Sequence, residues 1–164
     1  MVNVDITREA DLFWDLRHGI PFPDASVLEV YSSHLLEHLT HAQGQILLRE
    51  CRRVLVPGGL LSVAVPNARL YLEAYLGLVP LPEGLLGWAP AVNGTTAIDA
   101  ANYVAYMDGE HRYMFDQENL LHVISTAGFV DVQARAFDAD RDLLERDQES
   151  IYACARRPLS TDER

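Results

Sequence analysis

The sequence has few of the features that mark secreted or membrane-embedded proteins. Its 164 residues include only 2 cysteines, Cys51 and Cys154, too few for the disulfide framework of a small secreted domain. No run approaches the roughly 18 apolar residues of a membrane span. The start, Met1-Val2-Asn3-Val4-Asp5, lacks the cationic region of a secretory leader. These absences predict two buried thiols in a reducing compartment, and therefore a cytoplasmic protein.

Basic residues are also scarce. The chain has 13 Lys and Arg against 24 Asp and Glu, a formal net charge of -11. Because phosphate binding normally needs a basic face, this balance argues against nucleic acid as a partner and favours a small-molecule substrate. Hydrophobic residues make up 49% of the chain, and a chain of this length can bury one real core. We therefore expect a single domain over residues 1–164.

The stretch from Asp15 to Asn67 alternates strand-like and helix-like patterns. Val27 to Tyr31 is a short β-rich run, and Gln45 to Leu55 repeats apolar residues at the spacing of one helix face. Pro57-Gly58-Gly59 ends that helix, and Leu60 to Val65 is nearly continuously apolar, as in a strand covered on both faces. The opposite helix face is expected to be solvated and carries Arg49, Arg52 and Arg53. Strand, helix, turn and strand predict the βαβ unit of a parallel α/β sheet.

Two short strands precede this unit, and each ends at an acidic residue. Val2 to Ile6 alternates as a strand that carries Asp5, and Ala10 to Trp14 reads as a strand that delivers Asp15 at its carboxyl end. Ligands of open α/β sheets bind outside the carboxyl ends of the strands. Asp15 is therefore a candidate binding residue, with a turn cap or an ion pair to Arg17 or His18 as the alternative.

His34 is the first candidate catalytic residue because it follows the strand at Val27 to Tyr31. The segment His34-Leu35-Leu36-Glu37-His38 formally fits the HxxEH pattern of inverted zinc peptidases. A peptidase needs a third ligand and a helix of its own fold class, and five residues recur easily by chance. For Glu37 and His38 we favour a network that satisfies backbone groups at a helix start over a catalytic role. We expect no metal here, and a zinc hydrolase is the weaker alternative function.

Residues 66–110 form the least regular region and the longest interruption of the α/β pattern. Two helices are predicted in it, at Arg69 to Leu78 and at Thr96 to Met107. A lid over the substrate is the functional interpretation, and a dimer interface or an extension of the core is the structural one. The aromatic residues of the region do not decide between them.

The last part of the chain returns to helix and strand. His111 precedes a predicted helix at Gln117 to Ala127, and Phe129 to Phe137 and Ser150 to Arg156 are β-rich. His111 is a candidate base or substrate contact, or it bonds the preceding region in place. The charged segment Asp138 to Glu149 is expected to be a solvated loop or a short helix.

Three of these segments together resemble a known family. They are Ile20-Pro21-Phe22-Pro23-Asp24, then Ser33-His34-Leu35-Leu36-Glu37-His38-Leu39, then Leu48 to Gly59. In this order and spacing they are similar to class I S-adenosylmethionine (SAM) dependent methyltransferases, most of all the type 11 branch, which includes predicted members near surface-polysaccharide genes. The resemblance implies a Rossmann-like α/β sheet that ends in an antiparallel strand pair.

The resemblance also implies roles for residues at the expected cofactor edge. Asp5 matches the acid that takes the ribose hydroxyls of SAM, and Asp15 the acid that bonds the adenine amino group. Leu16 matches the residue whose backbone holds the adenine ring. Ser33 borders the methyl group together with His34.

The catalytic roles follow from the same resemblance. His34 or His111 is expected to take a proton from the methyl acceptor, since a general base of this kind is often a histidine. The acceptor is expected to be a small molecule or a saccharide. A non-catalytic interaction protein built on the same fold is the alternative function.

One departure from the family lies at the N-terminus. The family's first strand and glycine-rich loop lie roughly 20 residues before the ribose acid, but only four residues precede Asp5. Gly58 and Gly59 do not substitute, because they follow a helix and precede a strand. We therefore expect an N-terminally truncated sheet, in a degenerate enzyme, in a fragment of a longer one, or in a homodimer whose partner fills the gap.

Overall fold

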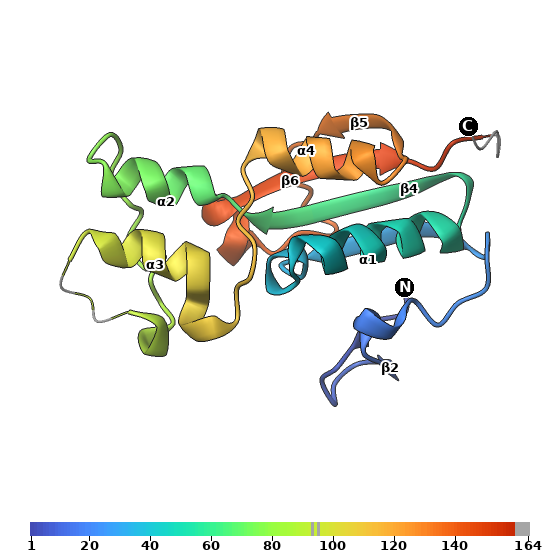
Figure 1. Ribbon diagram of the computed structural model, residues 1–164, viewed down its shortest axis with the longest axis horizontal. Coiled ribbons are helices and arrows are strands. Elements are labelled where there is room, and N and C mark those ends of the chain that lie inside the picture. Colours follow the sequence, from blue (N-terminus) through green and yellow to red (C-terminus); the bar gives the residue numbers. More distant parts are fainter. Residues whose placement is uncertain (93, 95, 160–164) are drawn as a thin grey trace.

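A four-stranded sheet forms the centre of the molecule. Its strands are β3 (Val27–Ser33), β4 (Leu55–Pro66), β5 (Val130–Ala134) and β6 (Ser150–Arg156). The computed structural model describes residues 1–92, 94 and 96–159 and orders the strands β3-β4-β6-β5 (Figure 1). β4 is parallel to β3 and antiparallel to β6, which is antiparallel to β5. The predicted α/β class with a C-terminal antiparallel pair is confirmed.

One short helix precedes the four strands in sequence, and the other helices lie in the connections between them. The α-helices are α1 (His41–Val54), α2 (Ala68–Tyr75), α3 (Ile98–Tyr106) and α4 (Gln117–Thr126). The 3₁₀ helices are η1 (Leu16–His18), η2 (Leu36–His38), η3 (Ala89–Ala91), η4 (Met107–Gly109) and η5 (Leu144–Glu149). None of the helices in the described ranges combines the length and apolar character needed to cross a bilayer.

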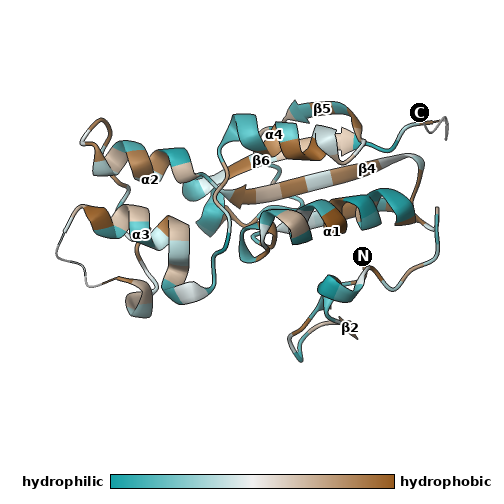
Figure 2. Cartoon of the chain, in the orientation of Figure 1, coloured by the Kyte–Doolittle hydropathy of each residue, from teal (hydrophilic) through white to brown (hydrophobic). Residues whose placement is uncertain are grey.

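Helices α1 and α4 lie side by side over the sheet. The Gln45 side-chain amide of α1 donates to the Val123 carbonyl of α4 at 3.1 Å, and apolar residues of both helices share one core with the sheet. The hydrophobic stripe of α1 and the largely hydrophobic β4 are visible in Figure 2. Cys51 belongs to this core, whereas Cys154 on β6 is only half-buried, so the prediction of two buried thiols is right for Cys51 alone.

Helix α1 begins four residues earlier than predicted. Thr40 and Gln43 form a capping box, in which the Thr40 side chain accepts from the Gln43 amide and the Gln43 side chain accepts from the Thr40 amide. This pair satisfies two orphan donors at the helix start. The polar residues before Gln45 therefore belong to the helix, although they interrupt its apolar pattern.

Strand β4 is the most deeply buried element. Leu61, Val63 and Val65 are at most 1% exposed, as the continuous apolar run predicts. The predicted strand start at Leu60 is wrong, because pairing already begins at Leu55 and the register then shifts opposite Val27 to Glu29. The Pro-Gly-Gly segment forms that irregularity. A Cβ at Gly59 would lie 2.8 Å from the Val56 carbonyl, so a larger residue would not fit there.

A small polar network lies against Ser62 of β4. The Arg135 guanidinium donates to the Ser62 hydroxyl at 2.9 Å, forms a two-point ion pair with Asp142, and lies over the Tyr152 ring. The Tyr31 hydroxyl donates to the same Asp142 carboxylate at 3.0 Å. The segment Asp138 to Glu149, expected to be solvated, thus supplies one buried charge, because Asp142 is 7% exposed.

The N-terminal residues form a second, smaller sheet. Strands β1 (Val4–Asp5) and β2 (Leu12–Phe13) pair in parallel, so each strand is shorter than predicted. Figure 1 shows β2 apart from the four-stranded sheet and below α1. β3 forms the outer edge of the larger sheet. In the described part of the chain the two sheets are therefore not joined by strand pairing.

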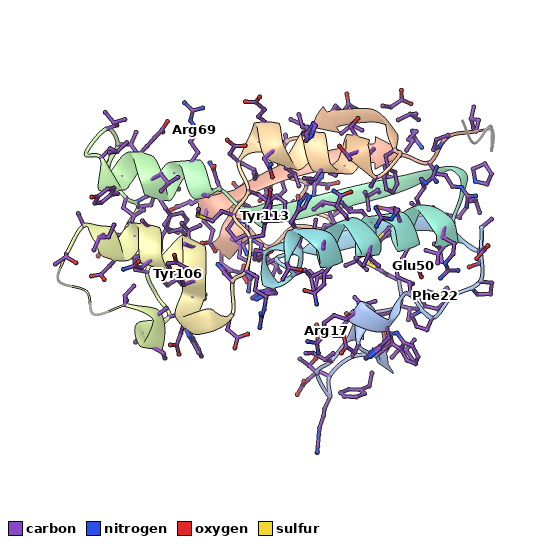
Figure 3. The ribbon with its side chains drawn as sticks, in the orientation of Figure 1. Arg17, Phe22, Glu50, Arg69, Tyr106 and Tyr113 are labelled. Carbon is purple, nitrogen blue, oxygen red and sulfur yellow. The ribbon has the colours of Figure 1, made fainter. Side chains whose placement is uncertain are left out.

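Arg53 of α1 holds the turn between the two sheets. Its guanidinium donates to the carbonyls of Ile20 and Phe22 at 2.9 and 3.0 Å and pairs with Glu50 and Asp24. The Glu50 carboxylate also accepts from the Ile20 amide at 3.1 Å, and Figure 3 shows Phe22 beside Glu50. Arg53 is thus part of a structural bridge, which corrects the expectation of a solvated arginine face.

Residues 66–110 fold around a small core of their own. Helices α2 and α3 bury Tyr71 and Tyr103, whose rings stack with centroids 6.0 Å apart, and Val104 packs with them. The Tyr71 hydroxyl donates to the Glu149 carboxylate at 2.5 Å, which attaches this part to the end of η5. The two predicted helices are confirmed: α2 begins one residue and ends three residues earlier than predicted, and α3 begins two residues later and ends one residue earlier. The lid role stays a prediction.

We expect Arg53→Ala to destabilise the protein and to release residues 1–24 in particular. The substitution leaves the Glu50 carboxylate and two carbonyls without their charged donor, and we expect a loss of about 1–3 kcal/mol. Chemical denaturation measures the loss, and limited proteolysis reports the N-terminal release. Arg49→Ala is the matched control, because Arg49 is an exposed arginine of the same helix. Equal stability and equal cleavage of the two variants would contradict the bridging role.

Candidate functional site

The carboxyl end of β3 turns sharply at His34. The His34 amide still donates to the Ala64 carbonyl of β4 at 2.9 Å, but its φ of 47° lies in the left-handed region that non-glycine residues rarely adopt. This turn takes the chain out of the sheet and into η2. As a result the His34 side chain faces the residues of η2 instead of continuing along the strand.

Glu37 lies at the centre of the site that follows. It is 2% exposed, and neither of its carboxyl oxygens has a hydrogen-bond partner among the described residues. Its main-chain carbonyl accepts from the amides of Arg112 and Tyr113 at 2.7 and 3.2 Å. These two bonds join η2 to a segment that is distant in sequence, and they bring His111 to the Glu37 side chain.

Three histidines surround the Glu37 carboxyl group. The Nδ1 atom of His34 lies 3.5 Å and the Nε2 atom of His38 lies 3.8 Å from Glu37 Oε1. Ligand atoms of Glu37, His38 and His111 all lie within 4.8 Å of one another. The rings of His38 and His111 meet edge to face with centroids 5.1 Å apart. The two predicted catalytic residues, His34 and His111, are thus in one cluster.

The outward-facing nitrogen of each ring fixes its tautomer. Nδ1 of His38 donates to the Glu110 carbonyl at 3.1 Å, and Nδ1 of His111 to the Val104 carbonyl at 2.9 Å, since a carbonyl can only accept. The Ser150 hydroxyl already donates to the Arg146 carbonyl at 2.7 Å. It therefore accepts from Nε2 of His34 at 2.8 Å. Each neutral ring keeps its other nitrogen as a bare acceptor.

Burial favours the uncharged forms of His34, Glu37 and His111. It lowers the pKa of His34 to about 3, with the nearby Arg146 charge as a further cause, and it lowers the pKa of His111. Burial also raises the pKa of the Glu37 carboxyl group to about 8. Neutral imidazoles near neutral pH are potential bases or metal ligands.

The HxxEH segment does not form a peptidase helix. Its helical part, η2, has only three residues, and His34 lies before it in a left-handed conformation. The expected backbone network at Glu37 and His38 is present through the Glu37 carbonyl and the His38 ring, although their partners at residues 110, 112 and 113 are distant in sequence. No local sequence pattern predicts that Glu37 and His38 lie next to His111, because this contact depends on the path of residues 66–110.

Asp5, Asp15 and Leu16 lie in the N-terminal part. Asp5 ends β1, and its carboxylate accepts from the Thr7 amide at 3.1 Å. Asp15 caps η1 and forms a two-point ion pair with Arg17, which lowers the pKa of Asp15 to about 2. Asp15 therefore has the role that was given as the alternative to cofactor binding: it caps a turn and forms an ion pair with Arg17. Leu16 packs against the main core.

The structure does not bring these acids to Ser33 and His34. The η1 turn is attached to α1 at Glu50, nine residues beyond His41 and so about 14 Å along the helix axis. Ser33 and His34 lie near the other end of α1, where η2 leads into it. Asp5 ends β1 and Asp15 follows β2, and these two strands are parallel neighbours. The described residues form no common cradle for both halves of the cofactor.

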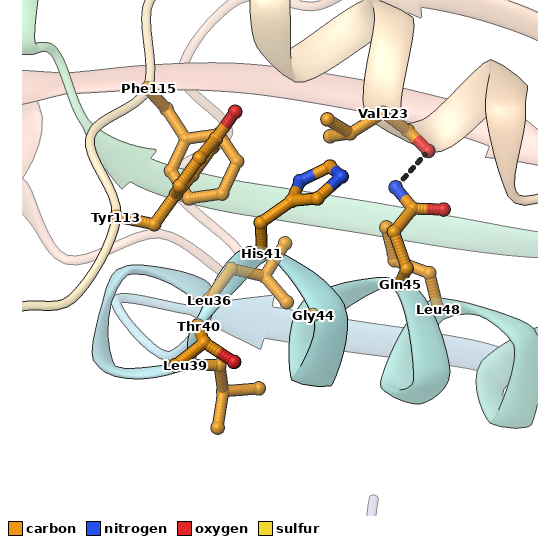
Figure 4. Close-up of a pocket in the computed structure, with 10 residues that line it drawn as sticks. All are labelled: Leu36, Leu39, Thr40, His41, Gly44, Gln45, Leu48, Tyr113, Phe115 and Val123. Carbon is orange, nitrogen blue, oxygen red and sulfur yellow. Dashed lines mark hydrogen bonds between the residues drawn. The ribbon is translucent and has the colours of Figure 1, made fainter.

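Two hollows lie on either side of Phe115, which lines both of them. One, between α1 and α4, is lined by His41, Tyr113, Phe115 and Gln45 among others (Figure 4). Its volume of about 10 Å³ is near the minimum for one water molecule. The other is an open groove of about 410 Å³ between α2 and the start of α4, a volume in the range of small-ligand sites. The groove is the larger of the two candidate substrate spaces.

Part of the chain is similar in sequence to known methyltransferases. Residues 8–63 match the Methyltransf_11 family of methyltransferase domains. Over 57 residues the chain is 47% identical to a protein of Mycolicibacterium smegmatis named "Probable S-adenosylmethionine-dependent methyltransferase". That match covers 32% of this chain and only 21% of the relative. The sequence similarity is therefore strong but confined to part of each protein.

Solved structures show the same fold over most of the chain. A SAM-dependent methyltransferase from Methanosarcina mazei aligns with a TM-score of 0.58 and 16% identity, covering 96% of this chain and 81% of that one. One from Archaeoglobus fulgidus aligns with a TM-score of 0.55 and 15% identity, covering 93% and 74%. The predicted resemblance to SAM-dependent methyltransferases is confirmed.

We expect Glu37→Gln to reduce the loss of stability that occurs as the pH rises. The folded protein holds the Glu37 proton up to about pH 8, whereas the unfolded chain releases it near pH 4.5. The retained proton therefore makes its full contribution to the free energy of unfolding below pH 4.5. This contribution is lost as the pH rises to 8, by up to about 1.4 kcal/mol per pH unit. Glutamine cannot titrate. Denaturation of both proteins at pH 5 to 8 with EDTA measures the difference.

Glu118→Gln, at an exposed glutamate of α4, is the control for loss of one carboxyl group. Parallel pH profiles for the unmodified protein and Glu37→Gln would show that Glu37 does not retain its proton on folding.

Proposed function

The chain is related in fold and sequence to class I SAM-dependent methyltransferases, and from this premise we propose that it transfers a methyl group from SAM to a small-molecule or saccharide acceptor. The family relationship implies the cofactor, and the cluster of neutral histidines around Glu37 supports a site for proton removal. The chain aligns with a fifth of its curated relative. Activity, acceptor and partner are therefore parts of the proposal.

The proposed roles divide between two parts of the chain. Asp5 and Asp15 bind the ribose and adenine of SAM, and the Leu16 backbone holds the ring. Ser33 and His34 border the reacting methyl group. SAM supplies an electrophilic methyl group and leaves as S-adenosylhomocysteine when the acceptor forms its new bond to that carbon. Positioning of the two reactants supplies most of the catalysis in such a displacement.

The acceptor loses its proton to the histidine cluster. A hydroxyl or amine that enters beside His38, whose side chain is 38% exposed, meets ring nitrogens that carry no proton. His34 and His111 are the proposed bases, because each ring donates through one nitrogen and leaves the other as an acceptor. The buried Glu37 carboxyl group lies beside the rings of His34 and His38 and has the capacity to share the proton.

A non-catalytic interaction protein is the second candidate function. The observation in its favour is the separation of Asp5 and Asp15 from the β3 end, together with the engagement of Asp15 by Arg17. A chain that has lost cofactor binding but kept the fold would retain the buried core and its exposed apolar residues as a surface for partners.

The test is calorimetric titration of the 164-residue protein with SAM and with S-adenosylhomocysteine. We expect saturable binding of both, weakened about 10- to 100-fold in Asp15→Ala, as for loss of a hydrogen bond to a charged group. Asp140→Ala, at an exposed aspartate, is the control with the same change of charge. Absence of binding at millimolar ligand would overturn the enzyme proposal and favour the interaction protein.

We also propose that a second copy of the chain completes the sheet at β3. The outer edge of β3 pairs with no other strand of the described part of the chain, and such an edge readily accepts another strand. Leu28 on β3 is 78% exposed, which suits burial against a neighbouring chain. In this arrangement the partner contributes to the space between β3 and the Asp5–Asp15 edge.

Molar mass in solution tests this proposal. We expect a dimer by size exclusion with light scattering, converted to monomer by Leu28→Lys because the new charge would be buried at the edge. Leu144→Lys is the matched control, since Leu144 is 72% exposed and lies on η5. A monomer for the unmodified protein, or a dimer that persists in Leu28→Lys, would refute pairing at this edge.

A further inference from the structure

We propose that Glu37, His38 and His111 form a binding site for a divalent transition-metal ion of the zinc class. Their ligand atoms lie within 4.8 Å of one another in a largely buried site at the carboxyl end of β3. Two imidazoles and one carboxylate are a ligand set that zinc proteins use when one position is kept for water or substrate. This inference departs from the sequence-based expectation, which included no metal ligand.

The first argument is the lack of hydrogen-bond donors in the cluster. Nδ1 of His34 and Nε2 of His38 and His111 are bare acceptors, because the opposite nitrogen of each ring is already hydrogen-bonded as the donor. The Glu37 carboxyl group, also buried and unpartnered, has at most one proton to offer. Buried acceptors without donors are costly, and a cation satisfies all of them at once.

The second argument is distance. Zinc binds imidazole nitrogen and carboxylate oxygen at roughly 2.0–2.2 Å, so two ligands in a tetrahedral site lie about 3.4 Å apart. The separation of Glu37 Oε1 and His38 Nε2 is 3.8 Å. That distance is too long for a hydrogen bond and suits two ligands of one ion. The remaining separations require side-chain movements of about 1 Å.

The third argument is the set of backbone groups that hydrogen-bond to the three ligand residues and hold them in place. Metal-binding imidazoles usually donate their second N–H to a carbonyl or carboxylate, which fixes the tautomer and the orientation of the ring. His38 and His111 do so to the carbonyls of Glu110 and Val104. The Glu37 backbone is held by the amides of residues 112 and 113. The three ligands are therefore oriented by the fold itself.

The charges around the cluster permit a cation. Arg146 acts on both His34 and Glu37, and Glu149 with the opposite sign acts on Glu37. Arg146 is exposed, so solvent weakens its repulsion of an ion.

The free coordination position faces the solvent side of the cluster. Glu37 and His111 are 2% and 8% exposed, whereas the His38 side chain is 38% exposed. An oxygen ligand, water or the hydroxyl of an acceptor, reaches the ion from that side. If the proposed methyl transfer holds, on which this role rests, the ion lowers the pKa of the acceptor hydroxyl. His111 then serves as a ligand, which leaves Nδ1 of His34 as the group placed to receive the proton.

The test is titration of the EDTA-treated, dialysed 164-residue protein with Zn²⁺, followed by calorimetry and by elemental analysis after gel filtration. We expect one Zn²⁺ per chain, and binding weakened at least about 100-fold in Glu37→Gln and in His111→Ala. Glutamine is close in shape to the neutral acid, so Glu37→Gln is expected to fold. His122→Ala, at an exposed histidine of α4, controls for surface binding and is expected to bind as the unmodified protein does.

Cobalt(II) provides a spectroscopic readout that does not depend on activity. We expect visible absorption bands of tetrahedral or five-coordinate Co²⁺ that Zn²⁺ displaces and that Glu37→Gln lacks. Absence of stoichiometric metal, or equal affinity in Glu37→Gln and His122→Ala, would overturn the site. Asp15→Ala is expected to keep full Zn²⁺ binding, so a failure of SAM binding and a failure of the metal site are distinguishable.

Discussion

The pairing of β4 on both of its edges is the constraint on which the rest of the structure depends. A strand this deeply buried must satisfy its amides and carbonyls within the protein, and β3 on one side and β6 on the other do so. β6 follows β5 in sequence but lies between β5 and β4, so the last strand must run antiparallel. This arrangement fixes the end of β3, and with it the place where His34 leaves the sheet.

The cluster around Glu37 is the part of the molecule least explained by folding alone. A carboxyl group buried without a partner lowers stability by about 1–3 kcal/mol, and three imidazoles present acceptors to it instead of donors. The surrounding backbone nevertheless holds all four groups in place. Such an arrangement is typical of functional sites, where local stability is given up for chemistry.

Features with a local cause could be predicted from the sequence. The apolar run of β4, the helices α2, α3 and α4, and the antiparallel C-terminal pair follow from periodicity, turn residues and the family resemblance. Arg53 and Asp142 could not be placed, because their partners at Ile20 and Arg135 are set by packing. His34 and His111 were found as separate candidates. Their meeting at Glu37 depends on a long insertion whose path has no sequence signature.

The two carbonyls that hold His38 and His111 belong to Glu110 and Val104, and main-chain atoms are the same in every residue type. Substitutions at these two positions would leave the imidazoles oriented as long as the chain between them kept its length and its two left-handed residues, Met107 and Asp108. An insertion or deletion of one residue there would rotate both rings away from Glu37. In related sequences, this segment is therefore expected to vary in composition but not in length.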